Sequence, residues 1–168
     1  MDAAARDADE ALVALHTAHY RSLVRLAALL LRDTPAAEDV VQDAFVAMHK
    51  SWGRLRETDK AVAYLRQAVV NRARSRLRHL KVVDKHAPVP MPDAPSAEVG
   101  ALQSAQRSEV MAALRRLPTR QREVLVLRYY SDLTEAQIAD ALGISTGAVK
   151  SHASRGVAAL RQTLEYSS

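Results

Sequence analysis

The chain has 168 residues and a formal net charge of +5, and it contains 48% apolar residues, 4% aromatic residues and no cysteine. The apolar fraction excludes a disordered chain, and the lack of cysteine excludes disulfides and thiolate metal sites. Because aromatic residues are few, the core is expected to consist mainly of Leu, Val and Ala, which favours packed helices, and the positive charge favours a polyanionic partner.

The N-terminal segment predicts a chain that is neither secreted nor inserted in a membrane. Its acidic sequence, MDAAARDADEAL, lacks the basic head and the long apolar run of a signal peptide. The apolar run Leu23–Leu31 is too short to span a bilayer, and Arg25 interrupts it. We therefore expect a cytoplasmic protein.

Three helices are predicted in the first half of the chain. Apolar residues recur at helical spacing in the first one, at Leu12, Leu15, Leu23, Leu26 and Leu30. The second helix is expected to have Thr34 as its N-cap and Pro35 as its first residue, and to end at Gly53. A polar loop over Arg54–Lys60 should follow, and the third helix should begin near Ala61. Alternating apolar and polar runs, which indicate strands, are missing.

A proline-rich segment, APVPMPDAPSAEVG (Ala87–Gly100), divides the chain and holds four of its six prolines. Proline lacks an amide donor and pushes the preceding residue out of helical geometry, so no helix or strand should run through this segment. We predict an all-α protein with two small helical domains, residues 1–86 and 104–168, joined by a flexible linker over residues 87–103.

The C-terminal domain is predicted to end in a helix-turn-helix. Upstream of it, a helix stops before Pro118 and another is capped by Thr119. In the sequence LTEAQIADALGISTGAVKSHASRGVAALRQTL, Thr134 is spaced for a capping box that closes the start of a short helix. Gly143 suits the left-handed end of that helix, and the next helix is capped by either Ser145 or Thr146.

The outer face of the second helix in this motif carries cations and small hydroxyl groups and no acid. Such a face suits a DNA major groove, where cations contact phosphates and short polar groups reach base edges. A solvated helical hairpin is the alternative, and the cap, the glycine and the acid-free face weigh against it. The candidate DNA-reading residues are Thr146, Lys150, Ser151, His152, Ser154 and Arg155.

Two helices of the first domain carry opposite charge. The third helix has a run of cations without an acid, which predicts a phosphate-binding surface, or alternatively a solvated basic helix: Arg66, Arg72, Arg74, Arg76, Arg78 and Lys81, with Asn71 and Ser75 between them. The second helix is acidic and has more apolar residues than one stripe needs, at Val41 and Phe45. It suits a basic protein partner, and equally an ordinary core helix whose acids complement its own dipole.

This order of an acidic helix, a basic Asn/Arg helix, a linker and a terminal helix-turn-helix resembles the extracytoplasmic-function (ECF) sigma factors of bacterial RNA polymerase, the smallest members of the sigma-70 family. The motifs that carry the resemblance are AEDVVQDAFVAMHKSW, AYLRQAVVNRARSRLR and LRRLPTRQREVLVLRYYSDLTEAQIADALGISTGAVKSHASRGVAAL. The resemblance covers nearly the whole chain, roughly residues 16–81 and 104–164. The Ala- and Arg-rich composition suggests an actinobacterial source.

The resemblance implies a sigma factor that recognises minus-35 and minus-10 promoter elements and initiates transcription of a specific regulon. It implies docking on the coiled coil of the largest polymerase subunit through Asp39, Gln42, Asp43 and Phe45. It implies that the minus-10 element is held by Arg54, Arg56, Lys60, Asn71, Arg72, Arg74, Ser75 and Arg78. The minus-35 element would be read by Thr146, Lys150, Ser151, His152, Ser154 and Arg155.

The implied partners are core RNA polymerase, through its largest-subunit coiled coil and its flap, and promoter DNA, with an anti-sigma protein left open. Catalysis belongs to the polymerase, so the resemblance implies no enzyme activity, cofactor or metal of the chain's own. His16 and His19 lack an evident third ligand, which also argues against a metal site. Around the melting loop the chain departs from many relatives, which carry more aromatic residues where this sequence has Val62, Ala63 and Tyr64.

Three other functions fit parts of the sequence. A stand-alone helix-turn-helix transcription regulator would not need the acidic helix or the Asn/Arg helix of the first domain. A small recombinase would need a nucleophilic serine in a strand-rich catalytic domain, and no strand pattern is present. A purely interacting adaptor would leave both basic faces unexplained.

Overall fold

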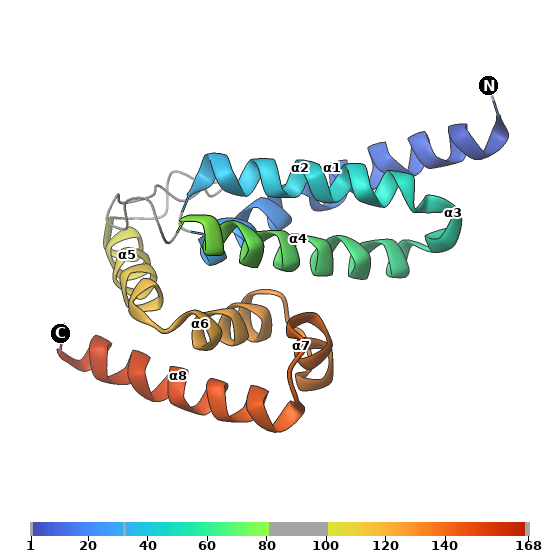
Figure 1. The fold of residues 1–168 in the computed structure, drawn as a ribbon. Helices are drawn as coiled ribbons and strands as arrows, with labels where there is room; N and C mark the ends of the chain where they lie inside the picture. The colour runs from blue at the N-terminus through green and yellow to red at the C-terminus, as the bar shows by residue number, and fades with distance from the viewer. Residues whose placement is uncertain (1, 32, 81–100, 167–168) are drawn as a thin grey trace. The chain divides into compact units, whose positions relative to one another are not determined.

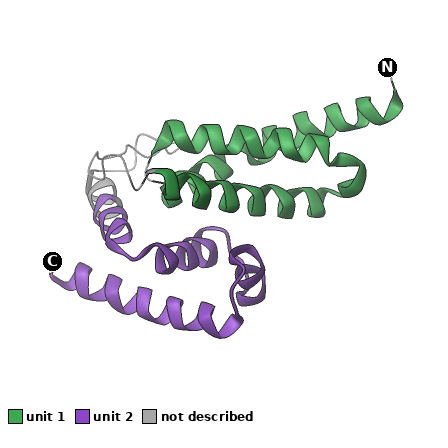
Figure 2. Ribbon diagram, viewed as in Figure 1, with its two compact units in different colours: residues 1–92 green, residues 93–168 purple. Residues whose placement is uncertain are grey.

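The protein is built from helices (Figure 1). The structure, a computed structural model, describes residues 2–31, 33–80 and 101–166. Every regular element within these ranges is helical, which confirms the predicted all-α class. The chain divides into two compact units, residues 1–92 and 93–168 (Figure 2). The proline-rich segment Ala87–Gly100 lies outside the described residues.

Unit 1 has three long helices, α1 (Ala3–Leu31), α2 (Thr34–Lys50) and α4 (Thr58–Leu80), and each packs against the other two. The short helix α3 (Trp52–Leu55) connects α2 to α4, so these two helices run antiparallel (Figure 1). Their apolar faces form a core whose most buried large side chains are Leu26, Leu30, Phe45, Met48, Leu65 and Val69.

Helix α2 is apolar on a wide face because it contacts both α1 and α4. Val41 is 0% exposed and Phe45 is 2% exposed. Packing on two neighbours explains why α2 has more apolar residues than one stripe needs, and for Val41 and Phe45 it favours the alternative of an ordinary core helix. The exposed large apolar side chain of α2 is instead Val46, at 53% exposure.

The start of α2 differs from the prediction by one residue. The N-cap is Asp33, whose side chain accepts a hydrogen bond from the Ala36 amide at 3.2 Å, and Thr34 is the first helical residue. An aspartate caps a helix at least as well as a threonine, and here it leaves Pro35 in the first turn, where proline is tolerated.

The end of α2 was also predicted incorrectly. The helix stops at Lys50, and the chain enters α3 at once, so Gly53 and Arg54 are helical. Because α4 begins at Thr58, the predicted loop Arg54–Lys60 contracts to Arg56 and Glu57. Arg56 makes the reversal with a left-handed backbone, φ 35° and ψ −2°, an unfavourable conformation for a residue with a side chain.

Unit 2 contains α5 (Ala101–Arg116), α6 (Thr119–Leu125), a π-helical turn η1 (Val126–Tyr130), α7 (Glu135–Leu142) and α8 (Thr146–Tyr166). Helix α8 packs against α5, α6 and α7. The last residues of the predicted linker, 101–103, belong to α5, because no proline follows Pro95 there to interrupt the helix.

The predicted helix-turn-helix signals are confirmed at atomic detail. The Gln137 amide donates to the Thr134 hydroxyl at 3.2 Å, and the Thr134 amide donates to the Gln137 side chain at 2.9 Å. Gly143 ends α7 with φ 67°. Of the two possible caps for α8, Ser145 makes the bond, accepting from the Ala148 amide at 3.1 Å. Upstream, the predicted cap Thr119 is wrong: it is the first residue of α6, after Pro118, which has no side-chain donor or acceptor.

Close packing of α8 on α6 depends on Gly156, a residue that the sequence pattern did not single out. A Cβ atom built there would lie 2.9 Å from Leu125 Cδ1 and 3.2 Å from Leu125 Cγ. Leu125 is 3% exposed, so it fills the space that the missing side chain leaves. Gly156 therefore lets these two helices approach more closely than an alanine would allow.

Candidate nucleic-acid and protein interfaces

The outer face of α8 presents five of the six predicted DNA-reading residues. Those that are exposed are Thr146, Lys150, Ser151, Ser154 and Arg155. The sixth, His152, is half-buried, and its Nδ1 atom is buried and without a hydrogen-bond partner among the described residues. Residues three and four apart share a helix side, so His152 lies on the same side as the buried Val149 and Gly156.

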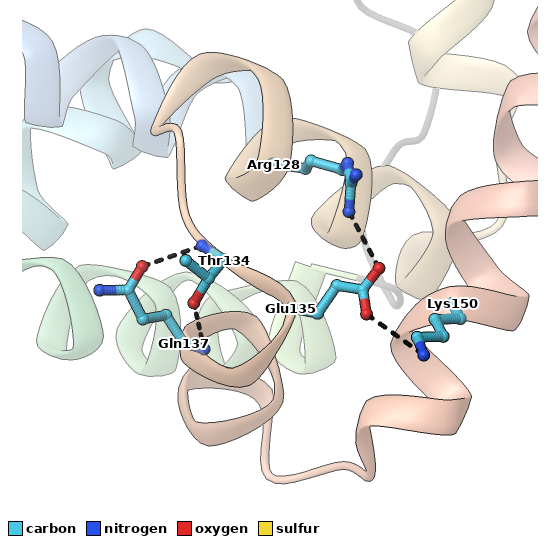
Figure 3. Close-up of polar contacts among 5 residues, drawn as sticks. All are labelled: Arg128, Thr134, Glu135, Gln137 and Lys150. Carbon is cyan, nitrogen blue, oxygen red and sulfur yellow. Dashed lines mark hydrogen bonds and ion pairs between the residues drawn. The ribbon is translucent and has the colours of Figure 1, made fainter.

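An acid from α7 contacts this basic face, although α8 itself carries no acid between Ser145 and Thr163. The two carboxylate oxygens of Glu135 lie 3.3 Å from Arg128 Nη1 and 3.8 Å from Lys150 Nζ (Figure 3). Glu135 was not among the predicted site residues, because it lies on α7 and not on the helix that carries the basic face. The contact depends on how α7 packs against η1 and α8, so no local pattern indicated it.

A shallow groove of about 410 Å³ runs between η1, the start of α7 and α8. The Arg128 guanidinium lies 5.9 Å from the ring centroid of Tyr129, which is 65% exposed. The described residues that line the groove are Arg128, Tyr129, Glu135, Lys150, Ala153, Ser154, Val157, Ala158 and Arg161. The groove thus combines an exposed aromatic ring with cations beside the predicted DNA-reading face.

The basic helix α4 exposes part of the predicted minus-10 surface. Asn71, Ser75 and Arg78 are exposed and lie three or four residues apart, which places them on one side of the helix. Arg72 and Arg74 are half-buried, and Lys81 lies outside the described residues. The structure therefore assigns Arg72 and Arg74 less solvent-facing positions than the charge run alone suggested.

Another basic residue of α4 contacts α2. Arg76 Nη2 lies 3.7 Å from the carboxylate of Asp39, and both side chains are partly exposed. The predicted polymerase-docking residue Asp39 therefore also pairs with the basic helix. An exposed pair of this kind contributes little to stability, so it leaves Asp39 available to another cation.

The corner between α2 and α4 collects the other predicted minus-10 residues. Arg54, Arg56 and Lys60 are all exposed, from α3, the turn and the first turn of α4 respectively. Lys60 Nζ lies 3.7 Å from Glu57 Oε2. The structure thus brings three cations to one end of unit 1.

The N-terminal part of α1 braces this corner. The Trp52 indole donates a hydrogen bond to Asp7 Oδ2 at 2.9 Å, and His49 Nε2 lies 2.8 Å from Asp9 Oδ1. These contacts span 45 and 40 residues in sequence, so no local pattern could have revealed them. Asp7 and Asp9 of the acidic N-terminal segment therefore have a structural role.

The acidic face of α2 presents Asp39, Gln42 and Asp43 to solvent. The predicted docking residue Phe45 is not exposed; its ring packs 5.1 Å from that of His16 and 6.4 Å from that of Tyr20. Beside this face lies a largely apolar groove of about 390 Å³ between α1 and α2, lined by Leu12, Val13, His16, Thr17, Gln42, Phe45, Val46, His49 and Lys50. Phe45 therefore forms part of the wall of the groove and does not project from the surface to contact a partner directly.

The described residues offer neither a metal site nor a membrane-spanning helix. No group of three or more metal-ligating side chains occurs among them. His16, one of the two histidines weighed as ligands, instead stacks on Tyr20 at a ring distance of 4.4 Å. Within the same part of the chain, no helix has the length and apolar character needed to cross a bilayer.

Comparison with known families matches each unit separately. Residues 15–82 match the model of sigma-70 region 2, and residues 107–160 match that of sigma-70 region 4. Among solved structures, the fold is similar to that of CnrH in complex with the cytosolic domain of CnrY, at 24% identity and a TM-score of 0.67, covering 99% of this chain and 100% of that one. It is equally similar to RpoE of Bartonella quintana, in complex with the anti-sigma factor NepR, at 24% identity and a TM-score of 0.68, covering 94% and 96%.

Curated relatives extend the similarity along most of the chain. The RNA polymerase sigma-E factor of Streptomyces avermitilis is 35% identical over 144 residues, which are 86% of this chain and 79% of the relative. The ECF RNA polymerase sigma factor SigM of Mycobacterium tuberculosis is 34% identical over 148 residues, 88% of this chain and 74% of the relative. Both organisms are actinobacteria, in agreement with the composition. The chain therefore belongs to the ECF subfamily of sigma-70-type RNA polymerase sigma factors.

Proposed function

We propose that this protein binds core RNA polymerase, recognises the minus-35 and minus-10 elements of a promoter and initiates transcription there. The observation that carries the proposal is the separation of charge over two units. Unit 1 combines an acidic helix face with a basic one, and unit 2 presents a second basic face on a helix-turn-helix. A protein that only bound DNA would have no use for the acidic face and its apolar groove.

Recognition of the minus-35 element is assigned to α8. Lys150 and Arg155 supply positive charge, and Ser151, Ser154 and Thr146 are short enough to approach base edges. A helix of this kind reads the major groove through its N-terminal half, where all five residues lie. His152 is left out of the contact set, because its side chain lies at the inner edge of the helix.

The minus-10 element is assigned to α4 and the adjoining corner. Asn71, Ser75 and Arg78 form the exposed face of α4, and Arg54, Arg56 and Lys60 extend it with further donors. Separated strands are held by cations along the backbone and by pockets for unstacked bases. The half-buried Arg72 and Arg74 are proposed to support this face from its edge.

Polymerase docking is assigned to α2. Asp39, Gln42 and Asp43 supply acidic and polar groups, and the adjacent groove supplies apolar surface through Val46. This combination suits a partner helix that carries both cations and apolar residues, such as one strand of the coiled coil of the largest subunit. From the family resemblance, we assign the flap of the polymerase as the protein partner of unit 2. An anti-sigma protein is proposed as an additional binding partner.

The proposed protein is an initiation factor and not an enzyme, since nucleotide addition belongs to the polymerase. It would act in the cytoplasm, where core polymerase and the chromosome are found. It needs no cofactor, because its contributions are positional and electrostatic.

Run-off transcription with purified core polymerase and a promoter library tests the proposal. Replacing Lys150 and Arg155 with alanine should reduce promoter-specific transcripts and leave polymerase binding unchanged. Asp43→Lys combined with Val46→Asp should abolish polymerase binding. Loss of polymerase binding in the first variant would contradict the division of roles, and promoter binding in the absence of polymerase with no effect on transcription would favour a stand-alone regulator.

A further inference from the structure

Glu135 joins three elements of unit 2 through one carboxylate. It opens α7, its Oε1 lies 3.3 Å from Arg128 of η1, and its Oε2 lies 3.8 Å from Lys150 of α8 (Figure 3). The capping box formed by Thr134 and Gln137 orders the backbone of the first turn of α7, from which Glu135 extends. The acid is thus held beside a cation of the proposed DNA-reading face.

Glu135 strongly affects the net charge of the groove between η1, α7 and α8. Of the described residues lining the groove, three are cations, Arg128, Lys150 and Arg161, and one is an acid, Glu135. The Lys150 side chain is 69% exposed and that of Glu135 is 33% exposed. Lys150 is therefore accessible to DNA. A DNA phosphate that binds Lys150 must compete with the carboxylate of Glu135, which is partly shielded from water.

We propose that Glu135 is a positioning residue that withholds Lys150 from backbone phosphates and so limits the affinity of unit 2 for non-specific DNA. The inference rests on the proposed DNA-reading role of α8 and adds a restraint to it. A phosphate and a carboxylate attract an ammonium group in similar ways, so exchanging one for the other yields little free energy. The remaining free energy of binding would have to come from a contact with a base or from a precisely placed phosphate.

Glu135 could instead serve only the helix to which it belongs. An acid in the first turn of a helix interacts favourably with the helix dipole. That role predicts a small loss of stability when the charge is removed and no change in how salt affects DNA binding. The two roles therefore differ in a measurable quantity, the dependence of DNA affinity on salt concentration.

The test uses the full chain and a fluorescein-labelled duplex of random sequence, with binding followed by anisotropy between about 50 and 200 mM salt. Glu135→Gln keeps the shape of the side chain and removes its charge. We expect the variant to bind roughly two- to fivefold more tightly at the lower salt concentration, the factor corresponding to one exposed ion pair. The slope of log K against log salt should steepen by roughly 0.9, the value for one added phosphate contact.

A double-mutant cycle shows whether the gain acts through Lys150. In the Lys150→Ala background, Glu135→Gln should produce no gain in random-duplex affinity and no change in salt slope, because no released ammonium group remains to contact a phosphate. Asp140→Asn is the matched control, because Asp140 is an exposed acid on the same helix and makes no ion pair among the described residues. It should produce less than half of the affinity gain and no change in slope.

Three outcomes would overturn the proposal: an unchanged salt slope for Glu135→Gln, an equal gain for Asp140→Asn, or a gain that persists after Lys150→Ala. Absence of duplex binding by both the wild-type chain and Glu135→Gln would overturn it as well. Failure of the wild-type protein to support transcription with core polymerase would refute the proposed function alone, because the cycle measures DNA binding by the chain itself.

Discussion

Replacing Gly156 with alanine tests the helix packing that places the DNA-reading face. The added methyl group would lie 2.9 Å from Leu125 Cδ1, and Leu125 is 3% exposed, so it has little room to move away. Overpacking of this kind costs about 1–3 kcal/mol, and the better helix propensity of alanine returns about 1 kcal/mol. We expect a net loss of about 1 kcal/mol in the stability of unit 2.

Gly147 provides the matched control on the same helix. A Cβ atom there would meet only Ser145 Oγ, at 3.8 Å, so Gly147→Ala should stabilise the protein by about 0.4–1 kcal/mol. Both variants are measured by urea unfolding of the full chain, followed by far-ultraviolet circular dichroism. If Gly156→Ala stabilised the protein as much as Gly147→Ala does, the claim of close packing would be refuted. Leu125→Ala should make Gly156→Ala favourable, because it removes the clashing atoms.

Two further predictions concern the ends of helices. Thr134→Ala removes one half of the capping box and should lower the stability of unit 2 by about 1 kcal/mol, measured from the same urea transition. Asp7→Ala removes the acceptor of the Trp52 indole hydrogen bond, and because Trp52 is the single tryptophan of the chain, its fluorescence emission should shift. An unchanged emission spectrum would mean that Asp7 does not hold the indole in solution.

Local signals in the sequence predicted local structure well. The capping box at Thr134 and the left-handed Gly143 involve residues a few positions apart, so the sequence contains all the partners. The N-cap of α2 was misplaced by one residue, because Asp33 and Thr34 are both good caps and only the folded backbone selects between them. Predictions of helix caps therefore tend to be wrong by about one residue, while the presence of the helix is predicted correctly.

Burial depends on contacts that the sequence does not list, and the predictions failed there. Phe45 lies on a helix that packs against two neighbours, so this one predicted docking residue is buried, whereas Asp39, Gln42 and Asp43 of the same helix are exposed. His152 lies three residues after Val149 and four before Gly156, both of which are buried. Because glycine has no side chain, the apolar pattern did not indicate that Gly156 belongs to the buried side of the helix. The family resemblance assigned roles by position and could not correct either residue.

The ion pairs at the proposed interfaces are more exposed to solvent than the Arg120–Glu123 pair in the interior of unit 2. Arg76 pairs with Asp39 at 3.7 Å and Lys150 with Glu135 at 3.8 Å, and in both pairs the side chains are at least one-third exposed. Glu123 by contrast is 3% exposed in its pair with Arg120. Exposed pairs are worth about 0–1 kcal/mol, whereas breaking a buried one costs several kcal/mol. The interface cations can therefore leave their protein partners for phosphates or another protein without disturbing the helices that carry them.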